Sequence, residues 1–218
     1  MKKSIPDRIS IVAVVVGLLV VCLAVARLSR CPEQNAHWST HRIEVSGGRS
    51  CSATAIGPHA LLTATHCESA FADIKIDGSP AHVDRIIYDT SDHSIYLLSG
   101  IIFYHIASIA PTKLGQGDAV YIYGNPEGVA THFDYLRRGY VVAIENNRKQ
   151  GSVAVMDLNG FFGDSGAAVF NACGEIETAM NTLFVDGTED SLAVIKVTKA
   201  LDLSFRPSDY ALARAYGR

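Results

Sequence analysis

The chain contains the heptapeptide Leu-Leu-Thr-Ala-Thr-His-Cys at residues 61–67, in an apolar run that begins just after Gly57-Pro58. An apolar run bounded by such turn residues is typical of a buried strand end, so His66 is not expected in a solvated loop. On its own, this histidine fits two interpretations, a hydrogen-bonded core residue or a catalytic base.

A second stretch, Gly163-Asp164-Ser165-Gly166, places a serine between glycines. A serine hydroxyl needs a base to accept its proton and donors that hold the oxyanion formed during attack. Glycines permit a tight turn in which the backbone N–H groups of Gly163 and Ser165 converge on one point. The same residue types are also the commonest in ordinary surface turns, which is the alternative interpretation.

Together with Cys51, the two stretches resemble the signature of the trypsin-like (chymotrypsin-fold) serine peptidases. In that family a Thr-Ala-Ala-His-Cys segment accompanies Gly-Asp-Ser-Gly; here Thr65 replaces one alanine. The resemblance implies that His66 is the general base and Ser165 the nucleophile of a peptide hydrolase.

The resemblance also implies several structural features. The backbone N–H groups of Gly163 and Ser165 would form the oxyanion hole, and a disulfide between Cys51 and Cys67 would hold the histidine loop. The implied fold is all-β, a chymotrypsin-like double β-barrel with six strands in each barrel and the site in the cleft between them.

The third catalytic role is a carboxylate that orients the histidine. The segment Asp-His-Ser-Ile-Tyr-Leu-Leu at residues 92–98 resembles the family's Asp-x-Ala-x-x-x-Leu segment, with Ser94 in place of alanine. We therefore expect Asp92 to be the triad acid. Asp89 and Asp84 lie near the same predicted strand and are the competing candidates.

The pattern of residues 42–203 supports an all-β domain independently of the resemblance. Short apolar or alternating runs are separated by Gly, Pro, Asn and Asp, which is typical of a sandwich or barrel. Strands are expected at residues 52–56, 60–65, 74–76, 83–88, 94–98, 120–123, 140–145, 153–157, 167–170, 176–181 and 192–197. No long helical period occurs between these runs, and the tail, residues 204–218, is expected to include a short helix.

Within the family, the chain is most similar to the short, high-temperature-requirement branch. The similarity rests on a Gly-x-Pro turn at residues 124–126, a Gly-x-Val strand at 139–141 and a closing strand at 191–196. The resemblance covers about residues 43–203, and no PDZ domain is expected.

Residues 1–30 are predicted to be a membrane-targeting segment. Basic residues precede an apolar run at residues 11–26, which is shorter than the roughly 20 residues of a full span. Either residues 9–28 remain as a signal anchor, with the catalytic domain on the periplasmic or extracellular side, or a signal peptide is cleaved near Ala26 and the protein is secreted. Residues 31–41 would then be a linker.

The chain has five cysteines, and Cys22 lies in the targeting segment. If Cys51 pairs with Cys67, then Cys31 and Cys173 remain, and a second disulfide between these two is a hypothesis. Disulfides would agree with an oxidising compartment. The alternative is that all of these cysteines are reduced, buried side chains.

In activation and specificity, the chain departs from the pattern of the family that it resembles. No Ile-Val-Gly-Gly activation peptide precedes Cys51 at a suitable distance, so Asp164 needs another partner or faces solvent. The position of the family's pocket floor is occupied by Asn159, which carries no charge, so a strong preference for Lys or Arg is not expected. The opposite pocket wall is expected from Met180, Asn181 and Thr182.

Composition excludes other classes of function. The chain has 218 residues, 48% of them hydrophobic, and a formal net charge of −3, without the basic patches of a nucleic-acid-binding protein. Its histidines lack the spacing of a zinc site, so neither metal nor cofactor is expected.

The expected partners are a polypeptide substrate and, through the N-terminal segment, a membrane. The alternatives are an inactive, membrane-tethered binding protein of the same fold and an esterase with the same triad.

Overall fold

The structure is a computed structural model of the chain. It describes residues 16, 34–45, 49–68, 73–126, 135–147, 151–186 and 195–217; only the backbone is described at residues 34, 35, 135, 147, 151, 182–186 and 195–197. The chain divides into two units, Met1–Pro32 and Glu33–Arg218. Apart from Val16, the predicted targeting segment lies outside the described residues. No helix in the described part of the chain is long and apolar enough to cross a bilayer.

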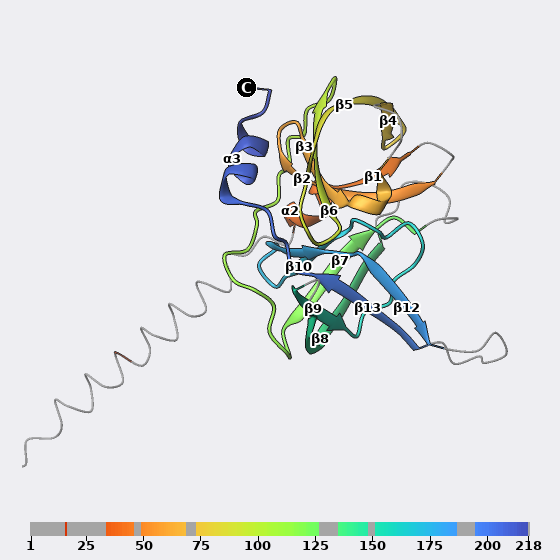
Figure 1. Ribbon diagram of the computed structural model, residues 1–218, viewed down its shortest axis with the longest axis vertical. Helices are drawn as coiled ribbons and strands as arrows, with labels where there is room; N and C mark the ends of the chain where they lie inside the picture. The colour runs from red at the N-terminus through yellow and green to blue at the C-terminus, as the bar shows by residue number, and fades with distance from the viewer. Residues whose placement is uncertain are drawn as a thin grey trace, which may run out of the picture. The chain divides into compact units, whose positions relative to one another are not determined.

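The first half of the Glu33–Arg218 unit is a closed, antiparallel barrel (Figure 1). Its strands are β1 (Thr40–Glu44), β2 (Ser50–Gly57), β3 (Ala60–Ala64), β4 (Asp73–Ile76), β5 (Ser79–Tyr88) and β6 (His93–Ser99). They follow the order β1-β2-β3-β6-β5-β4 around the barrel. Closure removes exposed strand edges, so every strand has a partner on both sides.

The second half is an antiparallel sheet of seven strands, in the order β11-β10-β7-β8-β9-β13-β12. The strands are β7 (Ala119–Gly124), β8 (Tyr135–Asn147), β9 (Gly151–Met156), β10 (Ala168–Asn171), β11 (Ile176–Ala179), β12 (Thr182–Asp186) and β13 (Ile195–Leu201). The expected double-barrel architecture is therefore present, but the expected six strands per barrel apply only to the first; the second sheet has seven.

Strand β2 shows how the two halves are joined. All of its residues are buried, because one face fills the first barrel and the other meets the second sheet. Ala53 and Ala55 belong to the interior of the first barrel, whereas Ile56 packs with Tyr121 and Phe170 of the second sheet. A strand buried on both faces carries a continuous apolar or small-residue run, which is what the sequence of β2 shows.

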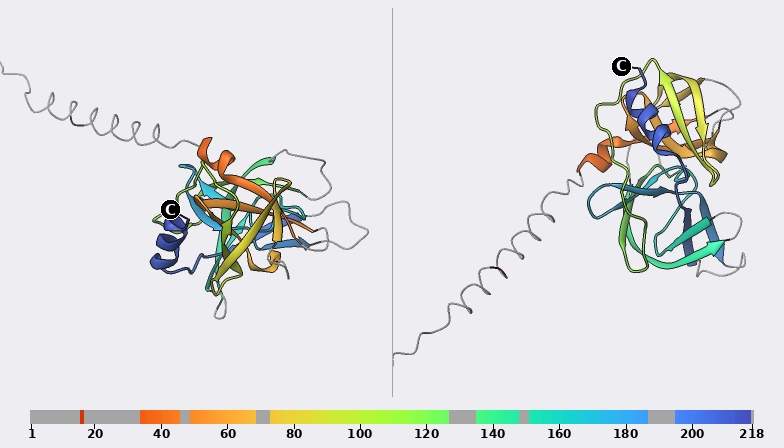
Figure 2. Two further views of the ribbon diagram at one scale, coloured as in Figure 1. Left: turned by 90° about the horizontal axis from the view of Figure 1, so that it is seen from above. Right: turned by 60° about the vertical axis from the view of Figure 1, so that its left-hand side comes forward.

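Three helical segments are described in the Glu33–Arg218 unit: α2 (Gln34–Ser39), the short 3₁₀ helix η1 (Thr65–Cys67) and α3 (Pro207–Ala215). Helix α3 confirms the helix expected in the tail, and it lies beside the first barrel (Figure 2). At Gly57 of β2, an added Cβ atom would lie 2.1 Å from the backbone oxygen of Ala213, so a glycine is needed for this close contact. Helix α3 thus packs directly on the strand that joins the two halves.

Candidate active site

His66 lies where the buried strand β3 turns into η1. The backbone is still extended at Ala64 and becomes helical from Thr65, which turns the chain at the barrel end. As a result the His66 side chain is 44% exposed, while the next residue, Cys67, is only 1% exposed. The predicted position of the histidine at a strand end is confirmed, and its ring is accessible to a ligand.

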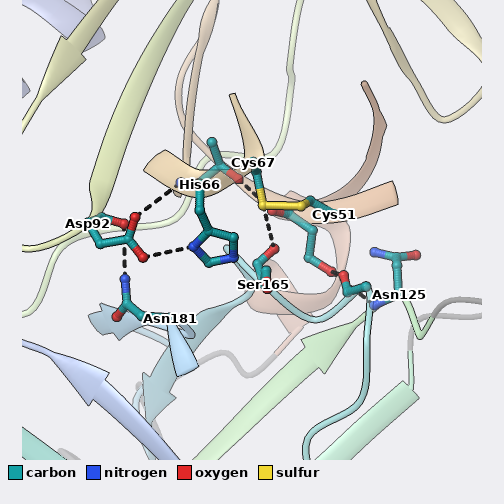
Figure 3. Close-up of a disulfide and its surroundings, with 10 residues drawn as sticks. Cys51, His66, Cys67, Asp92, Asn125, Ser165 and Asn181 are labelled. Carbon is teal, nitrogen blue, oxygen red and sulfur yellow. Dashed lines mark hydrogen bonds and ion pairs between the residues drawn. A yellow bond between two sulfur atoms is a disulfide. The ribbon is translucent and has the colours of Figure 1, made fainter. Parts of the chain in front are cut away.

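A disulfide joins Cys67 to Cys51 of β2, with an S–S distance of 2.01 Å and a Cα–Cα distance of 6.2 Å. The predicted bridge is therefore confirmed, and it ties η1 to the neighbouring strand (Figure 3). Cys173 is also disulfide-bonded. Its predicted partner, Cys31, lies outside the described residues, so that pairing stays a prediction.

Asp92 makes two contacts with His66. Its Oδ2 lies 2.8 Å from the imidazole Nδ1, and its Oδ1 accepts a hydrogen bond of 3.0 Å from the His66 backbone N–H. Burial raises the pKa of Asp92, but the hydrogen bond and charge of His66 outweigh this effect and hold that pKa below its ordinary value. An ionised Asp92 favours the tautomer with its proton on Nδ1, which leaves Nε2 free to act as a base.

The two competing carboxylates contact other groups. Asp89 Oδ2 lies 2.8 Å from Nδ1 of His93, and Asp84 accepts hydrogen bonds from Ser99 and Tyr216. Of the three candidates, Asp92 alone is hydrogen-bonded to His66 within the described residues.

The Asn181 side chain contacts the loop that carries Asp92, a role that the sequence did not indicate. Its Nδ2 donates to the backbone oxygen of Asp92 at 3.0 Å, and its Oδ1 lies 3.0 Å from Nε2 of His93. The backbone of Asp92 is left-handed, with φ of 64°, a conformation uncommon for residues other than glycine. The carbonyl of Asp92 also accepts from the Thr65 N–H at 2.9 Å, so contacts on two sides hold this conformation.

The turn that carries Ser165 is hydrogen-bonded to strand β2. The Ser165 carbonyl accepts from the Ser52 N–H at 2.8 Å, and the Ser52 hydroxyl donates to the Gly163 carbonyl at 2.8 Å. Gly166 has φ of 84°, and an added Cβ there would lie 2.3 Å from the Ser52 oxygen. Two conditions, the left-handed backbone and the close approach, therefore require glycine at this position.

Ser165 lies next to the histidine loop. Its carbonyl oxygen is 3.7 Å from Sγ of Cys67. Figure 3 shows Ser165 on one side of the His66 ring and Asp92 on the other. The structure thus brings together the three residues that the sequence analysis named, from β3–η1, from the β5–β6 loop and from the turn before β10.

The two predicted oxyanion donors are the backbone N–H groups of Gly163 and Ser165. Among the described residues, no group accepts a hydrogen bond from the backbone N–H of Gly163 or Ser165. The intervening Asp164 N–H, by contrast, donates to the Phe161 carbonyl at 3.1 Å. Both donors are therefore able to bind an oxygen of a ligand.

Asp164 has a partner that was not predicted, Arg137 of β8. The guanidinium makes two hydrogen bonds to the carboxylate, of 2.5 and 2.6 Å, and Asp164 is only 1% exposed. Asp164 also accepts from the Phe161 N–H at 2.6 Å. At Gly124 an added Cβ would lie 2.2 Å from both charged groups, so glycine makes room for the ion pair.

The predicted pocket residues lie in different surroundings. Asn159 is exposed, Met180 is 3% exposed within the core of the second sheet, and the Asn181 amide faces the Asp92 loop. The Thr182 side chain lies outside what the structure describes. The assignment of these residues to a substrate pocket stays a prediction. Within the described ranges, no cluster of His, Cys, Asp or Glu side chains is suited to bind a metal ion.

No protein-family model and no curated protein sequence matches the chain. Solved structures of proteases do match it. The Rv3671c protease from M. tuberculosis in its active form has a TM-score of 0.65 and 16% identity, over 86% of this chain and 85% of that one. Its inactive form has a TM-score of 0.62 and 17% identity, over 86% and 94% of the two chains.

An HtrA-type protease, AlgW, solved with a tripeptide, has a TM-score of 0.61 and 17% identity, over 78% of this chain and 59% of that one. Because the sequence identities are only 16–17%, these matches establish a common fold and nothing beyond it. The expectation of a chymotrypsin-like architecture is confirmed: the chain has the double-barrel fold of the trypsin-like serine peptidases of the HtrA type.

Proposed function

We propose that the chain is a serine endopeptidase that hydrolyses peptide bonds through Ser165, His66 and Asp92. The observation that carries the proposal is the 2.8 Å contact between His66 and Asp92 beside a glycine-flanked serine turn. Two further features support it: the exposure of His66, and the N–H groups of Gly163 and Ser165, which have no partner among the residues that the structure describes. That such a fold hydrolyses peptides is an analogy with its structural neighbours.

In the proposed mechanism, Nε2 of His66 takes the hydroxyl proton while Oγ of Ser165 forms a bond to the peptide carbonyl carbon. The N–H groups of Gly163 and Ser165 stabilise the resulting oxyanion. His66 then gives its proton to the amine as the C–N bond breaks. In the second half, His66 takes a proton from the water that attacks the acyl carbon. It then gives this proton to Oγ of Ser165 as the acyl C–O bond breaks and the acid product leaves. Asp92 stays ionised and stabilises the imidazolium.

A fluorophosphonate probe tests the nucleophile directly. We expect the oxidised, folded protein to be labelled covalently, and Ser165→Ala to lose all labelling, because only an activated serine displaces the leaving group of the probe. Ser79→Ala, which changes an exposed serine of β5, is the matched control and should be labelled like the wild type. Labelling that persists in Ser165→Ala contradicts the assignment.

Labelling together with turnover of ester and peptide substrates separates the alternatives. An unlabelled wild type that is folded and correctly oxidised would favour the inactive binding protein. A labelled protein that turns over small esters but no peptide would favour the esterase. Processing of a folded or unfolded polypeptide by the labelled protein supports the endopeptidase.

For specificity, we propose cleavage after uncharged residues, since Asn159 carries no charge to pair with a basic side chain. A peptide library digested by the wild-type protein and analysed by mass spectrometry should show uncharged residues before the cleaved bond. Cleavage mainly after Lys or Arg would contradict the proposed pocket. Ser165→Ala protein gives the background for this assay.

A further inference from the structure

A second imidazole–carboxylate pair, formed by His93 and Asp89, is buried directly behind the candidate site. Nδ1 of His93 lies 2.8 Å from Oδ2 of Asp89, and both side chains are 0% exposed. The carboxylate also accepts from the backbone N–H groups of Ser91 and His93 through Oδ1, at 2.7 and 2.9 Å. The Ser204 N–H donates to its Oδ2 at 3.0 Å.

These donors identify Asp89 as an ionised carboxylate. Burial raises the pKa of Asp89, but the hydrogen bond and charge of His93 and the surrounding N–H groups hold that pKa below its ordinary value. A carboxylate accepts hydrogen bonds and donates none. The proton between Asp89 and His93 therefore belongs to Nδ1.

The other nitrogen of His93 also faces an acceptor. Oδ1 of Asn181 is 3.1 Å from the Leu201 N–H, which can only donate, so this atom is the amide oxygen. The amide Nδ2, on the opposite side, faces the Asp92 carbonyl at 3.0 Å, which can only accept. The orientation of the amide is thus fixed, and Nε2 of His93, 3.0 Å from Oδ1, must donate to it.

Both ring nitrogens of His93 consequently carry protons, and the side chain is an imidazolium paired with Asp89. A neutral imidazole would place a lone pair against either the carboxylate or the amide oxygen, both of which are acceptors. Two opposed acceptors are costly around side chains that are fully buried. The charged pair satisfies every group that faces it.

The pair is connected to the catalytic residues through Asn181. The amide that accepts from His93 donates to the carbonyl of Asp92, whose left-handed backbone needs support from outside its own loop. We propose that the buried His93 imidazolium, held by Asp89, fixes the Asn181 amide and so positions Asp92 against His66. His93 is then a positioning residue for the proposed reaction, and this role rests on the proposed function.

The test compares His93→Leu with the wild type, and with the same change in an Asp92→Asn background. We expect His93→Leu to lower kcat about 10- to 100-fold, with KM near its wild-type value. A loss of this size is typical in metalloenzymes when the residue that hydrogen-bonds to a metal ligand and orients it is replaced. If His93 acts through Asp92, its replacement should leave kcat in the Asp92→Asn background nearly unchanged. Equal losses in both backgrounds indicate general damage and overturn the proposal.

His82 offers a matched control, because it lies 2.8 Å from Asp73 in an exposed imidazole–carboxylate pair of the same barrel. His82→Leu should keep wild-type kcat. His93→Gln, which keeps an amide donor but no charge, should lie between His93→Leu and the wild type. Wild-type kcat in a folded His93→Leu protein overturns the proposal.

Nuclear magnetic resonance of the wild-type protein gives a readout that needs neither activity nor a folded His93→Leu variant. Proton–nitrogen correlation spectra should show protons on both nitrogens of His93, assigned by their loss in His93→Gln, and an unprotonated nitrogen overturns the proposal. In His93→Gln the signal of the His66 Nδ1 proton should shift as its contact with Asp92 loosens, whereas an unchanged signal argues against positioning. Both readouts hold even if the wild type proves inactive, in which case only the proposed function fails.

Discussion

Ser165→Ala is expected to lower kcat for a peptide substrate by about 10⁶-fold, and Asp92→Asn by about 10⁴-fold. The first change removes the nucleophile. The second keeps the shape of the side chain but removes the acceptor for the Nδ1 proton, 2.8 Å away, so the imidazole favours the tautomer that cannot deprotonate the serine. Steady-state kinetics on a peptide substrate, with burst titration of active sites, measures both effects.

The combined variant provides the sharper part of this test. Because the residues act as one unit, Ser165→Ala with Asp92→Asn should be no slower than Ser165→Ala alone. Asp73→Asn, which removes the carboxylate of the exposed pair with His82, is the matched control and should keep wild-type kcat. An Asp92→Asn protein with nearly full activity would show that another group orients His66.

Much of the site was predictable because its signals are local in sequence. The apolar run before His66 indicated a buried strand end, and the glycines around Ser165 indicated a tight turn, as β3–η1 and the turn before β10 show. All eleven predicted strands overlap observed ones, but strands β1 and β12 were not predicted. The sequence of β1, Thr-His-Arg-Ile-Glu, is largely polar, and its apolar signal rests on Ile43 alone.

What could not be predicted depends on contacts between distant residues. Asp89 and Asp92 lie in one short loop, and only the resemblance of residues 92–98 to the family segment favoured Asp92 over Asp89 as the partner of His66. His93 and Asn181, which are hydrogen-bonded to each other, are 88 residues apart in the sequence. The pattern of apolar residues extended one predicted strand to residue 181, but β11 ends at Ala179, where Met180 and Asn181 turn to contact the Ser165 turn and the Asp92 loop.

The ion pair between Arg137 and Asp164 leads to the second large expected effect. Arg137→Met should lower the free energy of unfolding by about 3–5 kcal/mol, because it leaves the Asp164 carboxylate buried without a cation. Asp164 is 1% exposed and Arg137 13% exposed, so solvent cannot replace the lost partner. Urea unfolding followed by fluorescence or circular dichroism, under oxidising conditions, measures the change.

The companion variant separates the unpaired charge from the lost contacts. Arg137→Met combined with Asp164→Asn should recover part of the stability, because no buried charge remains. Lys113→Met is the matched control for a lost cation, since the Lys113 side chain is 76% exposed in its pair with Asp202 and should contribute little. If Arg137→Met is as stable as the wild type, the carboxylate must have another way to be satisfied.

Because Asp164 also accepts from the Phe161 N–H, the loss of its cation should loosen the turn before Ser165. Arg137→Met should therefore react with the fluorophosphonate more slowly than Lys113→Met even below its unfolding transition.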